Sequence, residues 1–404
     1  MRTWNRLLSA DEAREDFERA YQPRPATEEV DTAEALGRVL AAEIDSPEDL
    51  PPFRRSLMDG FAARAADIAA APATLHIVAD VRMGMPVDCR IHPGEAARVP
   101  TGGMLPEGAD VVVPVELAED EGDRVRVLEP LGAGRHLIER GEDVRAGDPL
   151  LGRGHPLRPP DIAALMGLGL TRVRVYRRPR VGILSTGDEV VPASETPPPG
   201  KIRDMNSYGL AASVTALGGV PLRFGIVPDE EEPLLAAAAA ALAQCDLLLL
   251  NGGSSVGEKD VTATVINRLG PPGVLVHGVN IRPGKPTIFA LCGEKPVFGL
   301  PGQPVSALNT FDLFVAPIIR RLQSLSGGPA TARARLAEPL HSADGREDHV
   351  RVMLESREGT LWATPIAGVS AMISTLVRAQ GITVVPAGAA GFDAGEEIEV
   401  RLIG

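Results

Sequence analysis

The stretch Leu247–Asp260, LLLLNGGSSVGEKD, decides the fold of the central part of this chain. Four consecutive leucines indicate a strand buried on both faces, as in a parallel sheet covered by helices. The strand ends in a loop of glycines and serines, and such sheets bind ligands beyond the carboxyl ends of their strands. Glycines let a ligand approach the backbone closely, and the amides of a following helix favour an anion. The loop is therefore a candidate phosphate cradle, although a plain strand-to-helix turn capped by Asp260 explains the same residues equally well.

The sequence around this loop alternates between strand and helix patterns. Strands are predicted in RVGILST, LRFGIV, DLLLL and KPVFGL, and helices at Asn206–Leu217, Pro233–Ala243, Val261–Leu269 and Val305–Leu322. This alternation predicts a doubly wound α/β domain whose parallel-rich sheet is covered on both faces. The loop at residues 251–257 matches neither the dinucleotide fingerprint nor a P-loop.

The flanking regions have other patterns. A helix is predicted near the start, where Ser9 and Glu12 form a capping box, and a second helix is predicted at Thr32–Ala42. Short runs with period two, LHIVADV, ARVP, DVVVPVE and DRVRVLE, predict a small β domain, and a helix follows at Asp161–Leu170. Residues 330–404 return to period two, as in EEIEVRLI, which predicts a second β module.

Composition limits the function classes. The chain has 404 residues, 44% of them hydrophobic but only 3% aromatic, and a formal net charge of −13, which argues against nucleic-acid binding. Three widely spaced cysteines predict neither disulfides nor a zinc site, and the histidines show no ligand spacing. The charged N-terminus and the absence of a long apolar segment predict a soluble, cytoplasmic protein without a membrane partner.

Further loops are expected at the same edge of the sheet. Asp188 and Glu189 follow the first strand, and Asp229 follows another, so these acids could bind Mg²⁺ that bridges to phosphate oxygens. The segment GLPGQPVSA, residues 299–307, precedes the longest predicted helix. Each loop alone could be a solvated turn, but loops at one edge face one crevice.

Cationic and acidic residues also stand in turns elsewhere. Arg282 and Lys285, in NIRPGKPTI, suit a small oxyanion or a phosphate, although a surface hairpin with solvated charges explains them as well. In the predicted β domain and beyond it, Asp59 lies in an Asp-Gly turn, Thr101 precedes two glycines, and Asp143 lies in a turn.

Seven motifs in a fixed order carry a resemblance to a known family. They are LPPFRRSLMDGFA, PTGGMLPEGAD, GEDVRAGD, ILSTGDEVV, NGGSSVGEKD, RPGKP and GLPGQPVSA. The chain resembles the molybdopterin molybdenumtransferases, the molybdate-inserting enzymes of molybdenum cofactor synthesis, and the corresponding domain of gephyrin. The resemblance implies a homodimer of four-domain subunits. The implied domains are a helical dimerisation domain at 1–52 and 140–178, an inserted β domain at 53–139, an α/β molybdopterin-binding domain at 179–328 and a C-terminal β-barrel-like domain at 329–404.

The resemblance also implies a reaction and a set of site residues. Adenylylated molybdopterin and molybdate are the substrates, Mg²⁺ is needed, and the pyrophosphate bond is cleaved with release of AMP. The implied catalytic residues are Asp59, Thr101, Asp143, Glu189, Asp229 and Asp260, of which the last three would hold Mg²⁺. The substrate would be bound by Gly252, Gly253, Ser254, Gly257, Pro301, Gly302 and Ser306, and molybdate by Arg282, Lys285, Pro286, Arg351 and Ser370. The crevice would lie between the α/β domain of one subunit and the inserted β domain of the other.

Several alternatives and departures accompany this interpretation. Arg351 fits the family motif better than Arg346, Gln303 stands where the family usually has asparagine, and Ser370 lacks a glycine that often follows it. Competing functions are a molybdopterin adenylyltransferase or related nucleotide pyrophosphohydrolase, a non-catalytic scaffold, and an enzyme that handles tungstate. Expected partners are the molybdopterin adenylyltransferase and downstream cofactor-processing proteins.

Overall fold

The computed structural model describes residues 7–252, 261–343 and 345–403, which form two compact units. The first unit comprises residues 1–28, 37–39 and 175–404, and the second comprises residues 29–36 and 40–174. Each unit has its own cores and is described by itself below. Among the described residues, no helix is long and apolar enough to cross a membrane.

A six-stranded sheet organises the first unit. Its strand order is β16 (Val220–Val227), β13 (Arg180–Thr186), β17 (Leu247–Asn251), β21 (Lys295–Leu300), β20 (Ile288–Cys292) and β18 (Pro272–His277). The first four strands run parallel, whereas β20 and β18 are antiparallel. In the centre, Leu249 lies opposite Ile183 on one side and Phe298 on the other. The four leucines therefore form a central strand, as predicted.

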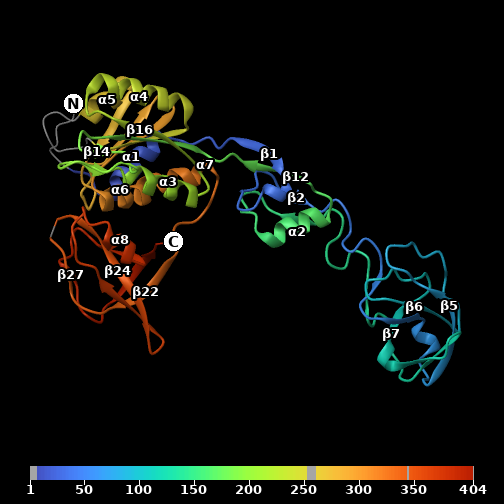
Figure 1. Cartoon of the computed structure of the whole chain (residues 1–404). Coiled ribbons are helices and arrows are strands. Elements are labelled where there is room, and N and C mark those ends of the chain that lie inside the picture. The colour runs from blue at the N-terminus through green and yellow to red at the C-terminus, as the bar shows by residue number, and fades with distance from the viewer. Residues whose placement is uncertain (1–6, 253–260, 344, 404) are drawn as a thin grey trace. The chain divides into compact units, whose positions relative to one another are not determined.

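Helices cover both faces of this sheet (Figure 1). On one face lie α4 (Glu231–Gln244) and α5 (Val261–Leu269), which pack on Leu248 and Leu250. On the other face, Leu247 and Leu249 contact the cluster formed by α1 (Ala10–Ala20), α3 (Asn206–Ala216), α6 (Pro304–Thr310) and α7 (Ala316–Leu322). Alternate leucines thus enter opposite cores, and each fully buried side chain contributes about 1.5–3 kcal/mol. The doubly wound α/β prediction is confirmed.

Helix α1 begins where the sequence predicts. The Ser9 hydroxyl accepts a hydrogen bond from the Glu12 amide at 3.1 Å, and the Ser9 amide donates to the Glu12 carboxylate at 2.8 Å. Further along, Phe17 contacts Phe289 and Phe298 of the sheet, with ring centroids 5.9 and 5.2 Å apart. The capping box thus starts a helix that packs on the α/β sheet.

A closed five-stranded barrel follows in the first unit. It contains β24 (Glu347–Arg357), β25 (Thr360–Pro365), β22 (Thr331–Leu336), β28 (Glu397–Leu402) and β26 (Gly381–Val385), and β24 also pairs with β26 to close the ring. Its core contains Leu336, Val352, Ala363 and Val400. The remaining elements here are α8 (Ser374–Arg378) and the paired strands β23 (Leu340–His341) and β27 (Gly391–Phe392). The predicted C-terminal β module is confirmed as a barrel.

The second unit contains another six-stranded sheet. Its order is β7 (Val111–Pro114), β4 (Gly60–Ala63), β6 (Glu95–Val99), β5 (Ala73–Asp80), β9 (Arg124–Val127) and β8 (Ala118–Asp120), with short 3₁₀ turns at Ala65–Asp67 and Val115–Leu117. Adjacent residues of β4 enter different cores, since Phe61 and Ala63 join one cluster and Ala62 joins another. This alternation explains the period-two pattern of the sequence.

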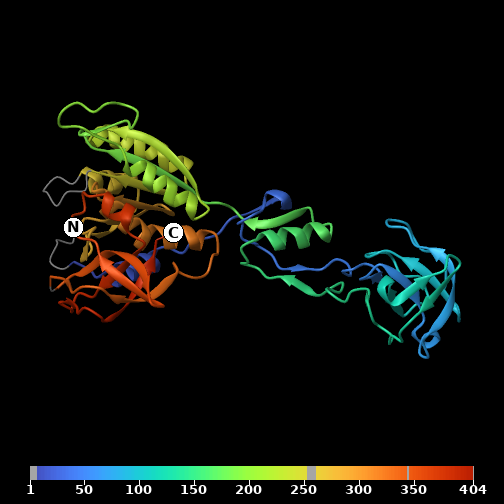
Figure 2. The same cartoon turned by 60° about the horizontal axis from the view of Figure 1, so that its bottom comes forward.

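Two extended arms lead to this sheet, side by side although far apart in the sequence (Figure 2). In the arms, β2 (Ile44–Asp45) pairs with β11 (Pro149–Leu151), and β3 (Arg55–Ser56) pairs with β10 (Leu137–Ile138). The predicted helix at Asp161–Leu170 is present as α2 (Pro159–Gly167), and β1 (Thr27–Asp31) pairs with β12 (Arg172–Tyr176).

Two helix predictions need correction. The segment Thr32–Ala42 is not an α-helix: a 3₁₀ turn covers only Thr32–Glu34, and Gly37 has a φ of +71° that a helix cannot contain. The amides of Leu40 and Ala41 instead bond to the carbonyls of His155 and Arg174. The long helix at Val305–Leu322 is interrupted by a π-helical turn at Phe311–Val315.

Candidate functional site

The carboxyl ends of the parallel strands form a small pocket in the first unit. Its lining comes from four loops, and includes Ser185, Thr186, Glu189, Asn206, Gly252 and Gly302. A shallow hollow of about 600 Å³ adjoins the pocket, and the two share the segment Ile202–Met205, which contains the short strand β15 (Ile202–Arg203) paired with β14 (Val190–Val191). The structure therefore brings the loop that contains Glu189 together with the loop that contains Gly302, as expected for loops at one edge of a parallel sheet.

Gly252 is fixed by its close approach to the neighbouring strand. Its φ is +109°, and a Cβ atom at this position would lie 2.0 Å from the carbonyl oxygen of Thr186. Its amide also donates to the Leu300 carbonyl at 3.2 Å. Only glycine fits here, because a side chain would collide with backbone rather than with a movable group. The predicted substrate-binding residues Gly253, Ser254 and Gly257, and the predicted metal ligand Asp260, lie outside the described residues.

An amide network joins the loops around Gly252. The side-chain nitrogen of Asn206 donates to Asn251 Oδ1 at 2.9 Å and to the Gly302 carbonyl at 2.8 Å. Asn251 in turn donates to the Pro301 carbonyl at 3.0 Å. Asn206, at the start of α3, thus fixes the loop that contains the predicted substrate-binding residues Pro301 and Gly302.

The buried residue Asp204 supports the same region, and the sequence interpretation did not assign it to the site. Its carboxylate accepts hydrogen bonds from the hydroxyls of Ser207 and Ser185 at 2.6 and 3.2 Å, and from the Ser207 amide at 3.1 Å. The last contact joins a carboxylate to an amide three residues later at a helix start, as capping residues do. The signal in the sequence was the polar run RDMNS before a predicted helix.

The predicted acidic residues lie in the loops after β13 and β16. Thr186 donates its hydroxyl to Asp229 Oδ1 at 3.3 Å, and the Asp229 amide lies 3.3 Å from Asp188 Oδ1. Glu189 is exposed and folds back, since a Cβ atom on Gly187 would lie 2.8 Å from its carboxylate. Within the described part of the chain, no three His, Cys, Asp or Glu side chains cluster as a ready metal site.

The predicted cationic loop connects the α/β sheet to the barrel. Strand β19 (Ile281–Arg282) pairs in parallel with the start of β24, and Asn280 donates to the Gly345 carbonyl at 2.6 Å. Arg282 and Lys285 are exposed, and Pro286 is half-buried. Asn309 of α6 donates to the Pro283 carbonyl at 2.9 Å, which fixes the loop from the other side.

Arg351 and Arg346 differ in their surroundings. Arg351 is buried, donates through Nη2 to the Gly368 carbonyl at 3.1 Å, and leaves its Nε without a hydrogen-bond partner. Burial and then the nearby charge of Arg282 lower the pKa of Arg351 below its usual range. Arg346 also leaves its Nε without a hydrogen bond, but this Nε forms an ion pair with Asp348, 3.3 Å from Oδ1. A buried cation next to a second cation would be stabilised by an anion, so this arrangement favours Arg351 over Arg346 as an oxyanion ligand.

The last two predicted residues of this unit lie near the start of α6. The carbonyl of Ser370 accepts a hydrogen bond from the Val305 amide at 3.1 Å, so the barrel loop is joined to this helix. Ser306 is buried on α6, and Gln303 precedes the helix without a capping side-chain bond. This agrees with the poor capping ability expected of glutamine.

In the second unit, the structure joins Asp59 and Thr101. The Thr101 amide and hydroxyl donate to the exposed Asp59 carboxylate at 2.6 and 2.9 Å. Asp143 lies in the turn after β10, with its amide bonded to the Leu50 carbonyl. Asp49, which the sequence interpretation missed, organises this turn by accepting from the Ala146 amide at 2.9 Å and Arg140 at 2.6 Å.

Comparison with known proteins identifies the class and then the family. Residues 182–321 match a "probable molybdopterin binding domain", which is the class that the covered sheet and its loops define. Residues 8–169 match the MoeA N-terminal region (domain I and II), and residues 333–403 match the MoeA C-terminal region (domain IV). The chain belongs to the MoeA family, and its role lies in molybdenum cofactor biosynthesis.

Individual relatives support this assignment. The molybdopterin molybdenumtransferase of a Nostoc species is 35% identical over 93% of this chain and 88% of its own length. That of Bacillus subtilis is 34% identical over 95% of this chain and 91% of its own length. The crystal structure of a molybdopterin biosynthesis MoeA protein from Pyrococcus horikoshii has 35% identity and a TM-score of 0.87, covering 98% of this chain and 99% of that one. The family, the fold class and the enzyme class predicted from the seven motifs are confirmed.

Proposed function

We propose that this enzyme inserts molybdate into adenylylated molybdopterin, with cleavage of the pyrophosphate bond and release of AMP. The observation that carries the proposal is Arg351, a buried cation with an unpaired Nε beside the charge of Arg282. Such a pair is suited to a small doubly charged oxyanion, which supplies the acceptor that Arg351 Nε lacks and a countercharge for Arg351. Lys285, Pro286 and Ser370 are proposed to complete the molybdate site.

The pocket at the sheet edge supports binding of the diphosphate. Its lining includes Gly252 and Gly302, two residues without side chains, so a phosphate can approach the main chain closely there. The adjoining hollow of about 600 Å³ includes the exposed side chains of Met205 and Tyr208, which offer apolar contact to a planar ring. A pocket that combines a polar end with an apolar end fits a nucleotide-linked pterin better than it fits phosphate alone.

Glu189, Asp229 and Asp260 are proposed to hold Mg²⁺. The described acids fit this ion, because carboxylate oxygens are its preferred protein ligands and one or two carboxylates with substrate phosphates suffice. When bound, Mg²⁺ would neutralise charge on the phosphate oxygens. The chain contributes the rest: Thr186 orients Asp229 by its hydrogen bond, and Asn206 fixes the loop of Pro301 and Gly302.

Further proposals come from the family. We propose a homodimer with a crevice that combines the α/β domain of one subunit with Asp59, Thr101 and Asp143 of the other. The four-domain division, with boundaries near 52, 139, 178 and 328, stays a prediction, as do contacts with the molybdopterin adenylyltransferase and downstream proteins. The three free cysteines, Cys89, Cys245 and Cys292, support a reducing cytoplasmic location.

The decisive experiment measures AMP released from adenylylated molybdopterin, with and without molybdate and Mg²⁺. We expect release that depends on both ions, with molybdenum appearing in the pterin. Formation of adenylylated product from ATP and molybdopterin would instead indicate an adenylyltransferase. Binding of the pterin nucleotide without any AMP release would indicate a scaffold, and tungstate in place of molybdate tests the choice of metal.

A further inference from the structure

A buried carboxylate lies between the two domains that supply the cations. Asp348 is 5% exposed, at the start of β24, where its backbone is the parallel partner of Arg282 and the antiparallel partner of Val385. Its Oδ2 accepts a hydrogen bond from the Ser342 hydroxyl at 2.6 Å. The position of this carboxylate is therefore fixed by two strands and a side chain.

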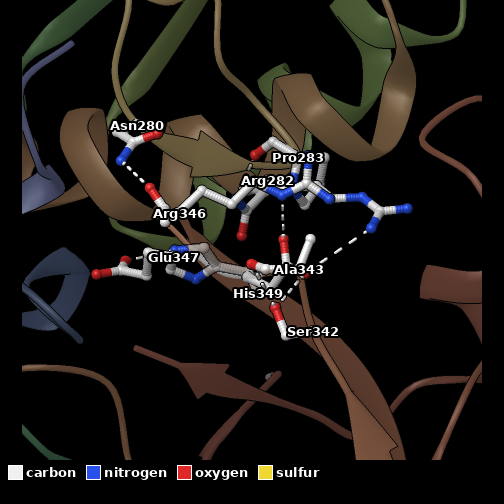
Figure 3. Close-up of polar contacts among 11 residues, drawn as sticks. Asn280, Arg282, Pro283, Ser342, Ala343, Arg346, Glu347 and His349 are labelled. Carbon is white, nitrogen blue, oxygen red and sulfur yellow. Dashed lines mark hydrogen bonds and ion pairs between the residues drawn. The ribbon is translucent and has the colours of Figure 1, made fainter. Parts of the chain in front are cut away.

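Two arginines approach this carboxylate from different domains. Arg282 Nη1, from the α/β domain, lies 3.8 Å from Oδ2, and Arg346 Nε, from the barrel, lies 3.3 Å from Oδ1. Figure 3 shows the side chains of Arg282, Arg346 and Ser342 around Glu347 and His349, the chain neighbours of Asp348. Asp348 is thus the countercharge shared by both arginines.

The pairing matters most for Arg282. Its side chain is 54% exposed and has Arg351 nearby, so repulsion would drive it toward solvent if nothing held it. A guanidinium has five donors in a rigid fork, and Arg282, whose Nη1 faces Asp348 at ion-pair distance without a hydrogen bond, keeps its other edge for a second anion. A long side chain that is already ordered also loses less freedom when it binds a ligand.

We propose that Asp348 is a positioning residue for the oxyanion pocket, holding Arg282 so that its free edge and the unpaired Nε of Arg351 bind one oxyanion together. This inference rests on the proposed molybdate site and adds a residue that does not touch the substrate. Removing the Asp348 charge also adds net positive charge to the pocket, which alone would strengthen anion binding. The two effects have opposite signs, and they are separated by comparing D348N in the wild type with D348N in an R282A background, where only the effect of charge remains.

The test is calorimetric titration of the full-length protein with molybdate. We expect D348N to weaken binding about three- to tenfold, the cost of ordering one released side chain, and D348E to recover part of the loss. In an R282A background, D348N should cause no further weakening. In a K285A background it should weaken binding as much as in the wild type, because Lys285 has no ion pair with Asp348.

The outcomes are distinguishable. Unchanged or tighter binding by folded D348N, or an undiminished effect in R282A, would overturn the positioning role while the oxyanion site stands. Absence of molybdate binding by the wild-type protein would overturn the proposed site and this inference with it. If D348N fails to fold, S342A, which removes the hydrogen bond to Asp348 but no charge, should weaken binding by a smaller factor, and unchanged binding there would count against the proposal.

Discussion

The amide and the hydroxyl of Thr101 donate to the same oxygen, Oδ1, of Asp59, at 2.6 and 2.9 Å. The amide bond, and then the hydroxyl bond, lower the pKa of Asp59 below its usual range. The two hydrogen bonds stabilise the fold through the ionised Asp59. Because the folded pKa lies below the unfolded value of about 3.9, this stabilisation is fully present above the unfolded pKa. It is lost as the pH falls through the folded pKa.

Thr101→Val should therefore raise the pKa of Asp59 only part of the way to its ordinary value. The valine removes the hydroxyl donor, whereas the amide donor, which has the larger effect, remains. The carboxyl carbon of Asp59, followed by NMR as a function of pH, measures this change. Thr101→Ser keeps both donors and should leave the pKa unaltered. An unchanged pKa in the valine variant would show that the hydroxyl bond has no role.

Gly252→Ala should destabilise the first unit by about 1–3 kcal/mol, because the residue has positive φ and its Cβ would collide with the Thr186 carbonyl. A lower thermal midpoint measures this effect. Gly302→Ala is the matched control: its Cβ would find its nearest neighbour at 3.7 Å, from Gly252, and its midpoint should hardly change. Equal midpoints in the two variants would contradict the role assigned to Gly252.

Arg351→Met should separate oxyanion binding from stability. The variant loses the bond to the Gly368 carbonyl but is relieved of a buried charge that burial and Arg282 disfavour, so without ligand it should be about as stable as the wild type. Molybdate at about a hundred times its dissociation constant should stabilise the wild type by about 2.7 kcal/mol, but not the variant. Arg357→Met, which removes an exposed arginine of the same strand paired with Glu355, should keep the molybdate effect. A full molybdate effect in Arg351→Met would refute the assignment.

Asp229→Asn should lower Mg²⁺-dependent AMP release at least about ten- to a hundredfold, the cost of changing even a residue that only supports a metal ligand. The substitution keeps the size of the side chain but removes a charged oxygen ligand. Glu294→Gln is the control, since Glu294 lies in the turn before β21, at the opposite edge of the sheet. Raising the Mg²⁺ concentration should restore part of the activity of Asp229→Asn. Wild-type activity at limiting Mg²⁺ would rule Asp229 out as a ligand.

Mixing inactive Asp59→Ala and Asp229→Ala subunits should restore part of the activity, up to about one competent crevice per heterodimer, if the site is shared across a homodimer. Each heterodimer would then contain one crevice with both acids intact. Mass-resolved confirmation of the heterodimer is the necessary control. Confirmed heterodimers without activity would argue for sites within single subunits.

Local signals predicted the elements of the α/β domain well. The capping box started α1 at the expected place, and Val261–Leu269 is α5 as predicted. The prediction failed at Thr32–Ala42, where helical spacing of apolar residues was overridden by Gly37 and by backbone bonds to distant segments. Spacing alone also gave no sign that β18 and β20 complete the sheet in antiparallel orientation.

The candidate site likewise contains residues that the sequence identified and residues that it did not. Glu189, Asp229 and Gly252 were identified because acids and glycines in loops after strands are local features, whereas Arg351, which lies on strand β24, was named only through the family resemblance. Asp204 and Asn206 were missed because their importance arises from partners far along the chain, Ser185 and Asn251. A polar residue before a helix has the same sequence signature whether it caps that helix or joins three loops.

By itself, the sequence determined the alternation of strands and helices, the glycine loop after the central strand, and the family. These depend on the period of apolar residues and on short motifs, which are local properties of a chain. Only the tertiary structure decided that Arg282, Arg346 and Ser342 share one buried carboxylate, and that Arg351 keeps a donor without a partner. Contacts between residues far apart in the sequence depend on strand register and domain packing. Burial likewise depends on everything that surrounds a side chain rather than on its neighbours in sequence.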